Sequence, residues 1–241
     1  MYEFYNNKLS EGQIKKAIKK LKNLYSFLPE TEGCLENINK PNGCSSWCCS
    51  EQNPQVSFAE FLYSWYYLSK KSKEDIFSVF SKAVQNYLSH NNKPCIFWNT
   101  ETKLCNQHLN RPFNCRIYSQ IPEEEFKPRY ERLKILYPNE NTRYQCDLTR
   151  VIGEALSKKD IDDYFESIKL IEKEVGVKSS LFHDGDGGSY RTYHDHLLLY
   201  LSTDSFLSLL TKIKTKGTDQ DKERIIKDLP EKIKEFPRLK W

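Results

Sequence analysis

Hydrophobic residues recur at helical spacing along most of the chain. Apolar positions at i, i+3, i+4 and i+7 mark one helical face in residues 14–28, 58–66, 76–88 and 161–171, and shorter apolar stretches follow at 197–201 and 206–210. Serines placed to cap a first turn precede four of these segments: Ser10, Ser57, Ser72 and Ser157. No alternating pattern predicts a long strand, and only residues 190–193 are expected to pair briefly. The sequence therefore predicts a mainly α fold.

Prolines and glycines set the expected ends of these helices. Pro29 is expected to stop the first helix, and Pro128 to limit or kink a short helix that opens at Pro122. The helix that follows Ser157 is expected to end near Gly176, and Pro230 to break the last amphipathic helix.

Eight cysteines fall between the predicted helices rather than on them. They gather in two segments, with one more in a later connection: Cys34, Cys44, Cys48, Cys49, Cys95, Cys105, Cys115 and Cys146. Neither a signal peptide nor a run of about 18 apolar residues is found, so we expect a cytoplasmic protein without a membrane span. Thiols stay reduced in that compartment, and clustered thiols there indicate a metal site. The expected architecture is an irregular helical domain with metal-binding loops between its helices.

Two parts of the chain are expected. Residues 1–150 hold an N-terminal amphipathic helix and the cysteine-cluster domain, and residues 151–241 form a C-terminal helical extension that packs on it. With 37 basic and 33 acidic residues interleaved along the chain, no basic nucleic-acid footprint is predicted. The densest basic stretch, Lys15 to Lys22, lies on the polar face of the first helix, as a solvated face or a contact for an anionic partner. No substrate or protein partner is identified by the sequence.

The spacing of the cysteines bears on the metal. Cys44, Cys48 and Cys49 lie in a short loop, and the side chains of the adjacent pair are expected to point apart. Such a pair suits a multinuclear cluster or two neighbouring metals better than one zinc ion, which takes four ligands. Arg111 and Arg116 flank Cys115, where they would offset thiolate charge unless they are ordinary surface arginines. We therefore predict an iron–sulfur cluster, of the 4Fe-4S type, with zinc as the alternative.

The same residues resemble a known family. The order Cys-x3-Cys-Cys, Glu60, Pro94-Cys95, Cys105 and then Arg-Pro-Phe-Asn-Cys-Arg at 111–116 is similar to the YkgJ-type cysteine-cluster family over residues 34–146. This resemblance implies a zinc- or iron-chelating domain with eight cysteines as ligands. Gln107 and His108 stand where that family tends to have Ile-Tyr, which makes His108 a candidate replacement ligand.

Two functions follow from that resemblance. A related cysteine pattern occurs in flagellin lysine methylases, which implies a redox or a protein- or peptide-modification role. The alternative is a zinc-binding structural or interaction module without catalysis. The sequence carries no Gly-rich strand-to-helix signature for S-adenosylmethionine, and it leaves open whether the chain is an enzyme.

A second polar cluster lies between the fourth and fifth of these apolar segments. His183, Asp184, Asp186, His194 and His196 are candidates for a substrate loop or a harder metal site. The alternative is a polar loop before a helix, with Thr192 or Asp195 near the N-cap.

Overall fold

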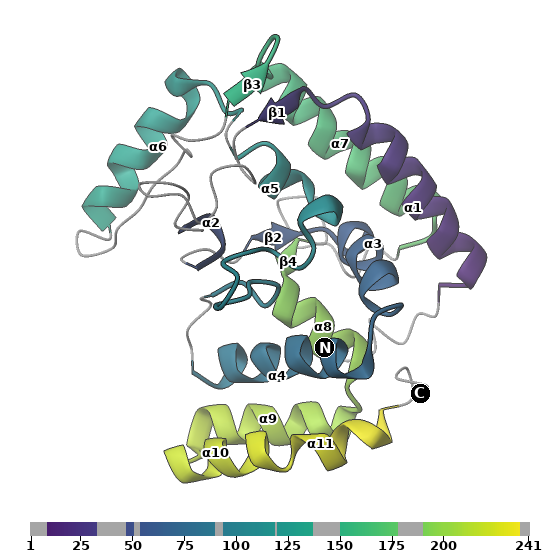
Figure 1. Cartoon of the computed structure of the whole chain (residues 1–241), viewed down its shortest axis with the longest axis vertical. Coiled ribbons are helices and arrows are strands. Elements are labelled where there is room, and N and C mark those ends of the chain that lie inside the picture. Colours follow the sequence, from purple (N-terminus) through teal and green to yellow (C-terminus); the bar gives the residue numbers. More distant parts are fainter. Residues whose placement is uncertain are drawn as a thin grey trace.

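The structure is a computed structural model that describes residues 9–32, 47–50, 54–89, 94–118, 120–136, 150–177 and 190–236. The described part is mainly helical, with short antiparallel strands, as the sequence predicts. Figure 1 shows the helices in layers around a centre made by α3, α4 and α8.

Three amphipathic helices that begin at serine caps form one side of the molecule. They are α1 (Glu11–Tyr25), α3 (Phe58–Leu68) and α7 (Lys158–Glu174), and each has the reciprocal capping box expected of its first turn. Helix α1 packs on both α3 and α7. Its lysine-rich face also reaches α7, because Lys16 and Lys20 lie 3.0 and 2.5 Å from the carboxylate oxygens of Glu174.

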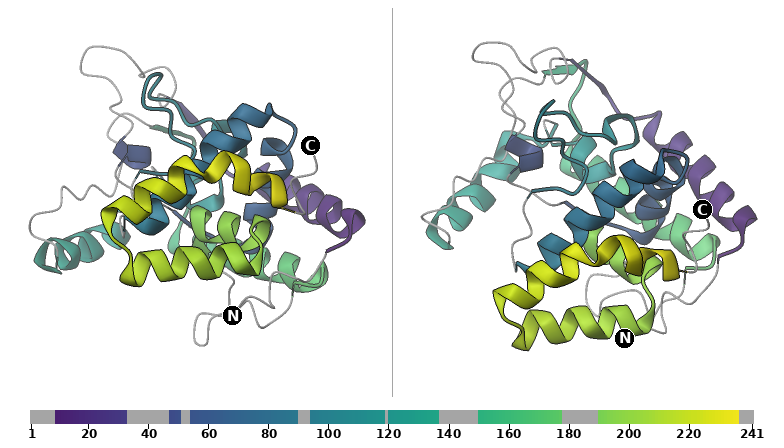
Figure 2. Two further views of the ribbon diagram at one scale, coloured as in Figure 1. Left: turned by 90° about the horizontal axis from the view of Figure 1, so that it is seen from below. Right: turned by 60° about the horizontal axis from the view of Figure 1, so that its bottom comes forward.

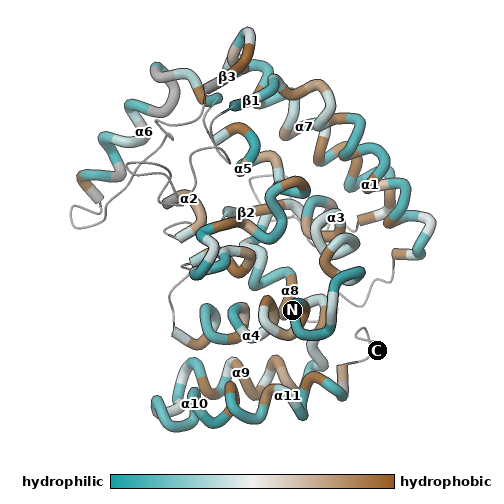
Figure 3. The backbone as a smooth tube through the Cα atoms, in the orientation of Figure 1, coloured by the Kyte–Doolittle hydropathy of each residue, from teal (hydrophilic) through white to brown (hydrophobic). Residues whose placement is uncertain are grey.

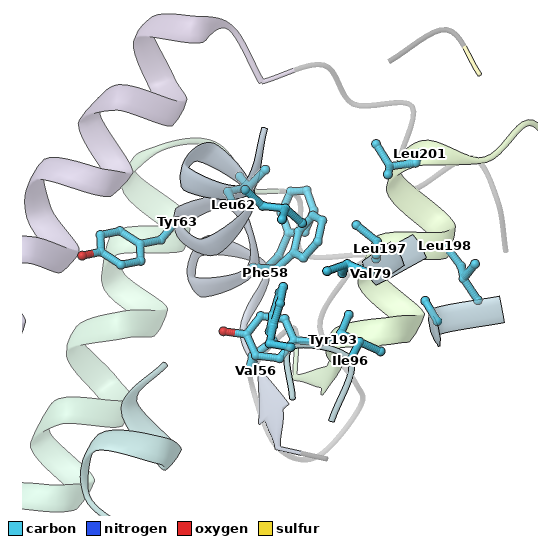
Figure 4. Close-up of a cluster of buried hydrophobic side chains, with 14 of the residues drawn as sticks. Val56, Phe58, Leu62, Tyr63, Val79, Ile96, Tyr193, Leu197, Leu198 and Leu201 are labelled. Atoms are coloured by element: carbon cyan, nitrogen blue, oxygen red, sulfur yellow. The ribbon is translucent and has the colours of Figure 1, made fainter. Parts of the chain in front are cut away.

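The centre of the core lies between α3, α4 (Lys73–Leu88) and α8 (Tyr193–Leu201). Ser72 caps α4 as predicted, and Thr192 caps α8 by accepting a hydrogen bond from the backbone of Asp195. Figure 4 shows the side chains that meet there, among them Phe58, Leu62, Val79 and Leu197. Each of these four is at most 3% exposed, which places the main hydrophobic contribution to stability at this junction.

The C-terminal helices form a layer beneath α4. They are α9 (Asp204–Lys216), α10 (Asp219–Lys227), α11 (Leu229–Lys232) and the 3-10 turn η4 (Ile233–Glu235). Figure 2 shows the same layer from two further sides, and Figure 3 shows hydrophobic and hydrophilic positions alternating as α9 and α10 turn. Helix α10 ends before Pro230, which takes a first-turn position in α11 where its missing N–H costs nothing.

Two short strand pairs hold distant segments together. Strand β2 (Gln55–Val56) pairs antiparallel with β4 (Arg191–Thr192), which confirms the brief strand expected at 190–193. Strand β1 (Glu30–Glu32) pairs with β3 (Arg150–Ile152), a pairing that the sequence did not predict. Each strand is two or three residues long, too short for a two-residue alternation to be recognised.

The remaining described elements surround the cysteine loops. They are α2 (Trp47–Ser50), the 3-10 turn η2 (His108–Asn110), α5 (Phe113–Arg116) and α6 (Glu123–Leu136). Helix α6 runs through Pro128 and on to Leu136, so of the two expected effects of this proline, a limit or a kink, the limit is wrong. The helix loses one backbone hydrogen bond there and continues. No described helix is both long enough and apolar enough to cross a bilayer.

Candidate metal centre

Five of the predicted cysteine ligands lie in the described residues. Cys48 and Cys49 are on α2, Cys95 and Cys105 lie in the segment between α4 and η2, and Cys115 is on α5. None of the five forms a disulfide. The other three predicted ligands, Cys34, Cys44 and Cys146, lie outside the described residues.

After α3 and α4 the chain returns to α2. The backbone N–H of Cys95 donates to the carbonyl of Cys49 over 2.8 Å, although 46 residues separate them in the chain. Residues 97–106 then form a tight hairpin. Trp98 and Cys105 form an antiparallel β-bridge in it, and the N–H of Asn106 donates to the carbonyl of Phe97. This folding brings the segments of Cys49, Cys95 and Cys105 together.

The sulfur atoms of Cys95 and Cys105 each accept a hydrogen bond from a nearby backbone amide. The backbone N–H of Phe97 donates to the sulfur of Cys95, and that of Gln107 donates to the sulfur of Cys105. In both cases the donor lies two residues after the cysteine. An N–H directed at sulfur stabilises the thiolate over the thiol, and it orients the sulfur for a ligand. These amides act through the backbone, so no side-chain pattern in the sequence reveals them.

The adjacent pair Cys48–Cys49 does not point apart. The two sulfur atoms lie 3.9 Å from each other, so that expectation is wrong. The pair lies on a helical turn, where successive side chains are about 100° apart rather than on opposite sides as in a strand. The Cys49 thiol also hydrogen-bonds to Cys105, so three sulfur atoms are neighbours.

Hydrogen bonding among these three thiols decides which of them loses its proton first. Donation from Cys49 lowers the pKa of Cys48 to about 7 against the effect of burial, and Arg111 adds to the lowering. The same donor lowers the pKa of Cys105, helped by the Gln107 amide. The pKa of Cys49 is raised because its proton is shared with both neighbours. Cys48 and Cys105 are therefore the thiols best prepared to act as thiolate ligands.

The other two thiols are deeply buried. Burial raises the pKa of Cys95 to about 12, with a further contribution from the charge of Cys105. Burial also raises the pKa of Cys115, and nearby Cys95 and Cys105 act in the same direction. A bound metal cation reverses this effect, because it replaces the proton and deprotonates the thiol outright.

The two arginines that flank Cys115 have different surroundings. The charge of Arg111 lowers the pKa of Cys48, Cys105 and Cys115, though in each case as a lesser effect than hydrogen bonding or burial. The guanidinium of Arg116 donates instead to the carbonyls of Leu109 and Arg111, and lies 4.5 Å from the ring centroid of Tyr25. Arg111 thus acts electrostatically on the thiols, whereas Arg116 fixes the loop before Cys115.

Polar atoms beside the cysteines are buried without a hydrogen-bond partner among the described residues. They are Trp98 Nε1, Gln107 Nε2, Arg111 Nε and both ring nitrogens of His108. Burial of an unpaired donor is costly, which points to an acceptor that binds there. Thiolates and sulfides accept such bonds, so the donor set fits a thiolate-bound metal. Within the described ranges, however, no three Cys, His, Asp or Glu side chains converge tightly enough to hold one ion.

A buried carboxylate positions α5, which carries Cys115. Glu60 Oε1 accepts hydrogen bonds from the Tyr25 hydroxyl at 2.7 Å and from the Phe113 N–H at 2.6 Å. Its other oxygen, Oε2, accepts from the N–H of Ser57 at 3.0 Å, which completes the capping box of α3. The capping-box pattern predicted the local bond, but the two long-range bonds depend on the fold. Glu60 therefore connects α1, α3 and α5.

The histidines of the second polar cluster are part of the packed core. His196 Nε2 lies 2.9 Å from the carbonyl oxygen of Val56, and its ring packs against those of Phe58 and Phe61. His194 Nε2 lies 3.3 Å from the Thr192 hydroxyl and is 3% exposed. The other three candidates of that loop, His183, Asp184 and Asp186, lie outside the described residues.

Replacing His196 with alanine is expected to lower the free energy of unfolding by about 3 kcal/mol. The change removes a buried ring that packs between α3 and α8, together with its hydrogen bond to strand β2. Urea unfolding measures the loss, and metal content is expected to stay at the wild-type level. Loss of metal with unchanged stability would instead indicate that His196 is a ligand.

Comparison with known families agrees with this geometry. Residues 40–134 match the family model CxxCxxCC, described as "putative zinc- or iron-chelating domain". The matched segment contains six of the eight cysteines: Cys44, Cys48, Cys49, Cys95, Cys105 and Cys115. No curated protein and no solved structure matches the chain. Residues 40–134 are thus similar to the CxxCxxCC family, and this match confirms the cysteine-cluster resemblance drawn from the sequence.

Proposed function

We propose that the chain binds an iron–sulfur cluster through these thiols and uses it in a redox or protein-modification reaction. The observation that carries the proposal is that five thiols from three segments, namely α2, the hairpin at 95–107 and α5, lie close enough for their hydrogen bonds or charges to act on one another. The candidate ligands that spacing and family resemblance both support are Cys44, Cys48, Cys49, Cys95, Cys105 and Cys115. Cys34 and Cys146 are weaker candidates, which could bind a second metal or remain free thiols.

The number of thiols supports more than one metal ion. A single tetrahedral zinc takes about four ligands, and five described thiols exceed that number. Iron–sulfur clusters spread their thiolates over several irons, so a larger and wider set of cysteines suits them. When bound, such a cluster supplies one-electron transfer at a potential that its surroundings tune. Arg111 and the unpartnered N–H donors would stabilise its negative charge, and they are the residues expected to set that potential.

Zinc is the second candidate, and one distance favours it. Two thiolates on one tetrahedral zinc, at metal–sulfur distances of about 2.3 Å, place their sulfur atoms about 3.8 Å apart. Cys48 and Cys49 are 3.9 Å apart, which fits that geometry, whereas each iron of a 4Fe-4S cluster takes only one thiolate. In this case the metal would fold α2, the hairpin and α5 together, and the domain would serve as a structural or interaction module.

Elemental analysis of the purified full-length chain tests the choice. Protein purified without oxygen is expected to contain iron and acid-labile sulfide, and to show broad visible absorbance that bleaches on reduction. A matched sample exposed to air is expected to lose iron and sulfide. Stoichiometric zinc without iron or sulfide in both samples would contradict the iron–sulfur proposal and support the structural module.

We also propose that the protein works in a reducing compartment, in agreement with the cytoplasmic location expected from the sequence. Cys48 and Cys49 have sulfur atoms 3.9 Å apart and are not joined in a disulfide. Metal binding needs these thiols reduced, and a reducing compartment keeps them so.

A further inference from the structure

We propose that Tyr193, the first residue of α8, is a positioning residue of the cysteine centre, so that metal binding depends on the part of the chain that follows the cysteines. This inference rests on the metal-binding function proposed above. Tyr193 follows the last cysteine of the sequence, Cys146, by 47 residues.

The hydroxyl of Tyr193 acts on the loop before Cys115. It lies 2.7 Å from the Ser64 hydroxyl on α3, and Ser64 in turn donates to the carbonyl of Asn110 over 3.2 Å. Asn110 precedes Arg111, whose charge acts on the thiols. Tyr193 and Ser64 thus fix the turn that leads into α5, and the phenol is the outer member of this chain of bonds.

The ring of Tyr193 acts on the loop of Cys95. It meets the ring of Phe97 edge to face, with centroids 4.7 Å apart and planes at 82°. Phe97 is the residue whose backbone N–H donates to the sulfur of Cys95. Figure 4 shows Tyr193 in the same part of the core as Ile96, which lies between Cys95 and Phe97 in the chain. A shift of this ring would therefore be transmitted to the amide that orients Cys95.

Burial and charge agree that Tyr193 is close to the thiols. The residue is 1% exposed, and its pKa is raised by that burial and then by the charges of Cys115 and other neighbours. A side chain held so tightly has little freedom to move away, which is the property that a positioning residue requires.

Cobalt(II) titration of the metal-free full-length chain tests the inference, since its thiolate charge-transfer bands report the ligands directly. Tyr193→Phe keeps the ring contact with Phe97 and removes only the hydroxyl. We expect about 10- to 100-fold weaker cobalt(II) binding and altered thiolate bands, the range typical of residues that support ligands. Ser64→Ala, which breaks the same chain of bonds, is expected to act in the same direction.

Tyr87→Phe is the matched control. Tyr87, on α4, lies 3.2 Å from the Thr211 hydroxyl on α9, so this change also removes one phenol–hydroxyl contact between the two parts of the chain. Its cobalt(II) affinity and bands are expected to equal those of the wild type. Equal behaviour of the Tyr193 and Tyr87 variants would overturn the inference, whereas a wild-type chain that binds no cobalt(II), zinc or iron would overturn the proposed function itself.

Discussion

Replacing Cys105 with serine is expected to abolish stoichiometric metal binding. The sulfur of Cys105 lies beside that of Cys49 and accepts a hydrogen bond from the backbone N–H of Gln107. Cys105 also forms a β-bridge with Trp98 in the hairpin. Serine offers a weaker ligand at the same place, and the hairpin then loses the cross-link that the metal provides. Structural zinc contributes about 10–16 kcal/mol in small domains, so the loss of one ligand is expected to be severe.

Metal content per chain and chelator competition measure this effect. Thr100→Ser is the control, because Thr100 is exposed in the same hairpin and lies between Cys95 and Cys105 in the chain. This variant is expected to keep full metal content and the wild-type spectrum. Full metal content in the Cys105 variant, with unchanged chelator resistance, would remove Cys105 from the ligand set.

The helices were predictable because their signals are local. Apolar spacing and serine caps depend on residues within about one or two turns, and the capping boxes at Ser10, Ser57 and Ser157 all form. Strands β1 and β3 have no such signal, since their pairing joins Thr31 to Val151 across the chain. A contact of that kind is fixed by packing of the surrounding helices rather than by the two segments themselves.

The centre was predictable in residue type and only partly in geometry. Cysteine spacing indicated a metal site, and the family model supports zinc or iron chelation there. The approach of Cys48 to Cys49 follows from a helical turn that spacing alone does not reveal. The amides of Phe97 and Gln107 and the phenol of Tyr193 carry no motif, because each acts through a contact that exists only in the folded chain.

Replacing Glu60 with glutamine is expected to destabilise the protein by about 3 kcal/mol and to lower its metal affinity. The carboxylate is 2% exposed and accepts from three donors: the Tyr25 hydroxyl and the N–H groups of Ser57 and Phe113. A glutamine has one acceptor oxygen, so its NH2 group must face an N–H donor in a buried place. Hydrogen bonds to charged groups contribute about 1.5–3 kcal/mol each, and a buried donor left unpaired adds a cost of its own.

Asp160→Asn separates the role of Glu60 from ordinary helix capping. Asp160 has the same place in the capping box of α7, but it is exposed, and it accepts from the backbone and hydroxyl of Ser157, only three residues away. Its replacement is expected to cost about 1 kcal/mol or less and to leave metal binding unchanged. Urea unfolding and chelator competition of both variants give the comparison. Equal losses would mean that Glu60 only caps α3; a larger loss with faster metal release means that it holds Phe113, and through it Cys115, in place.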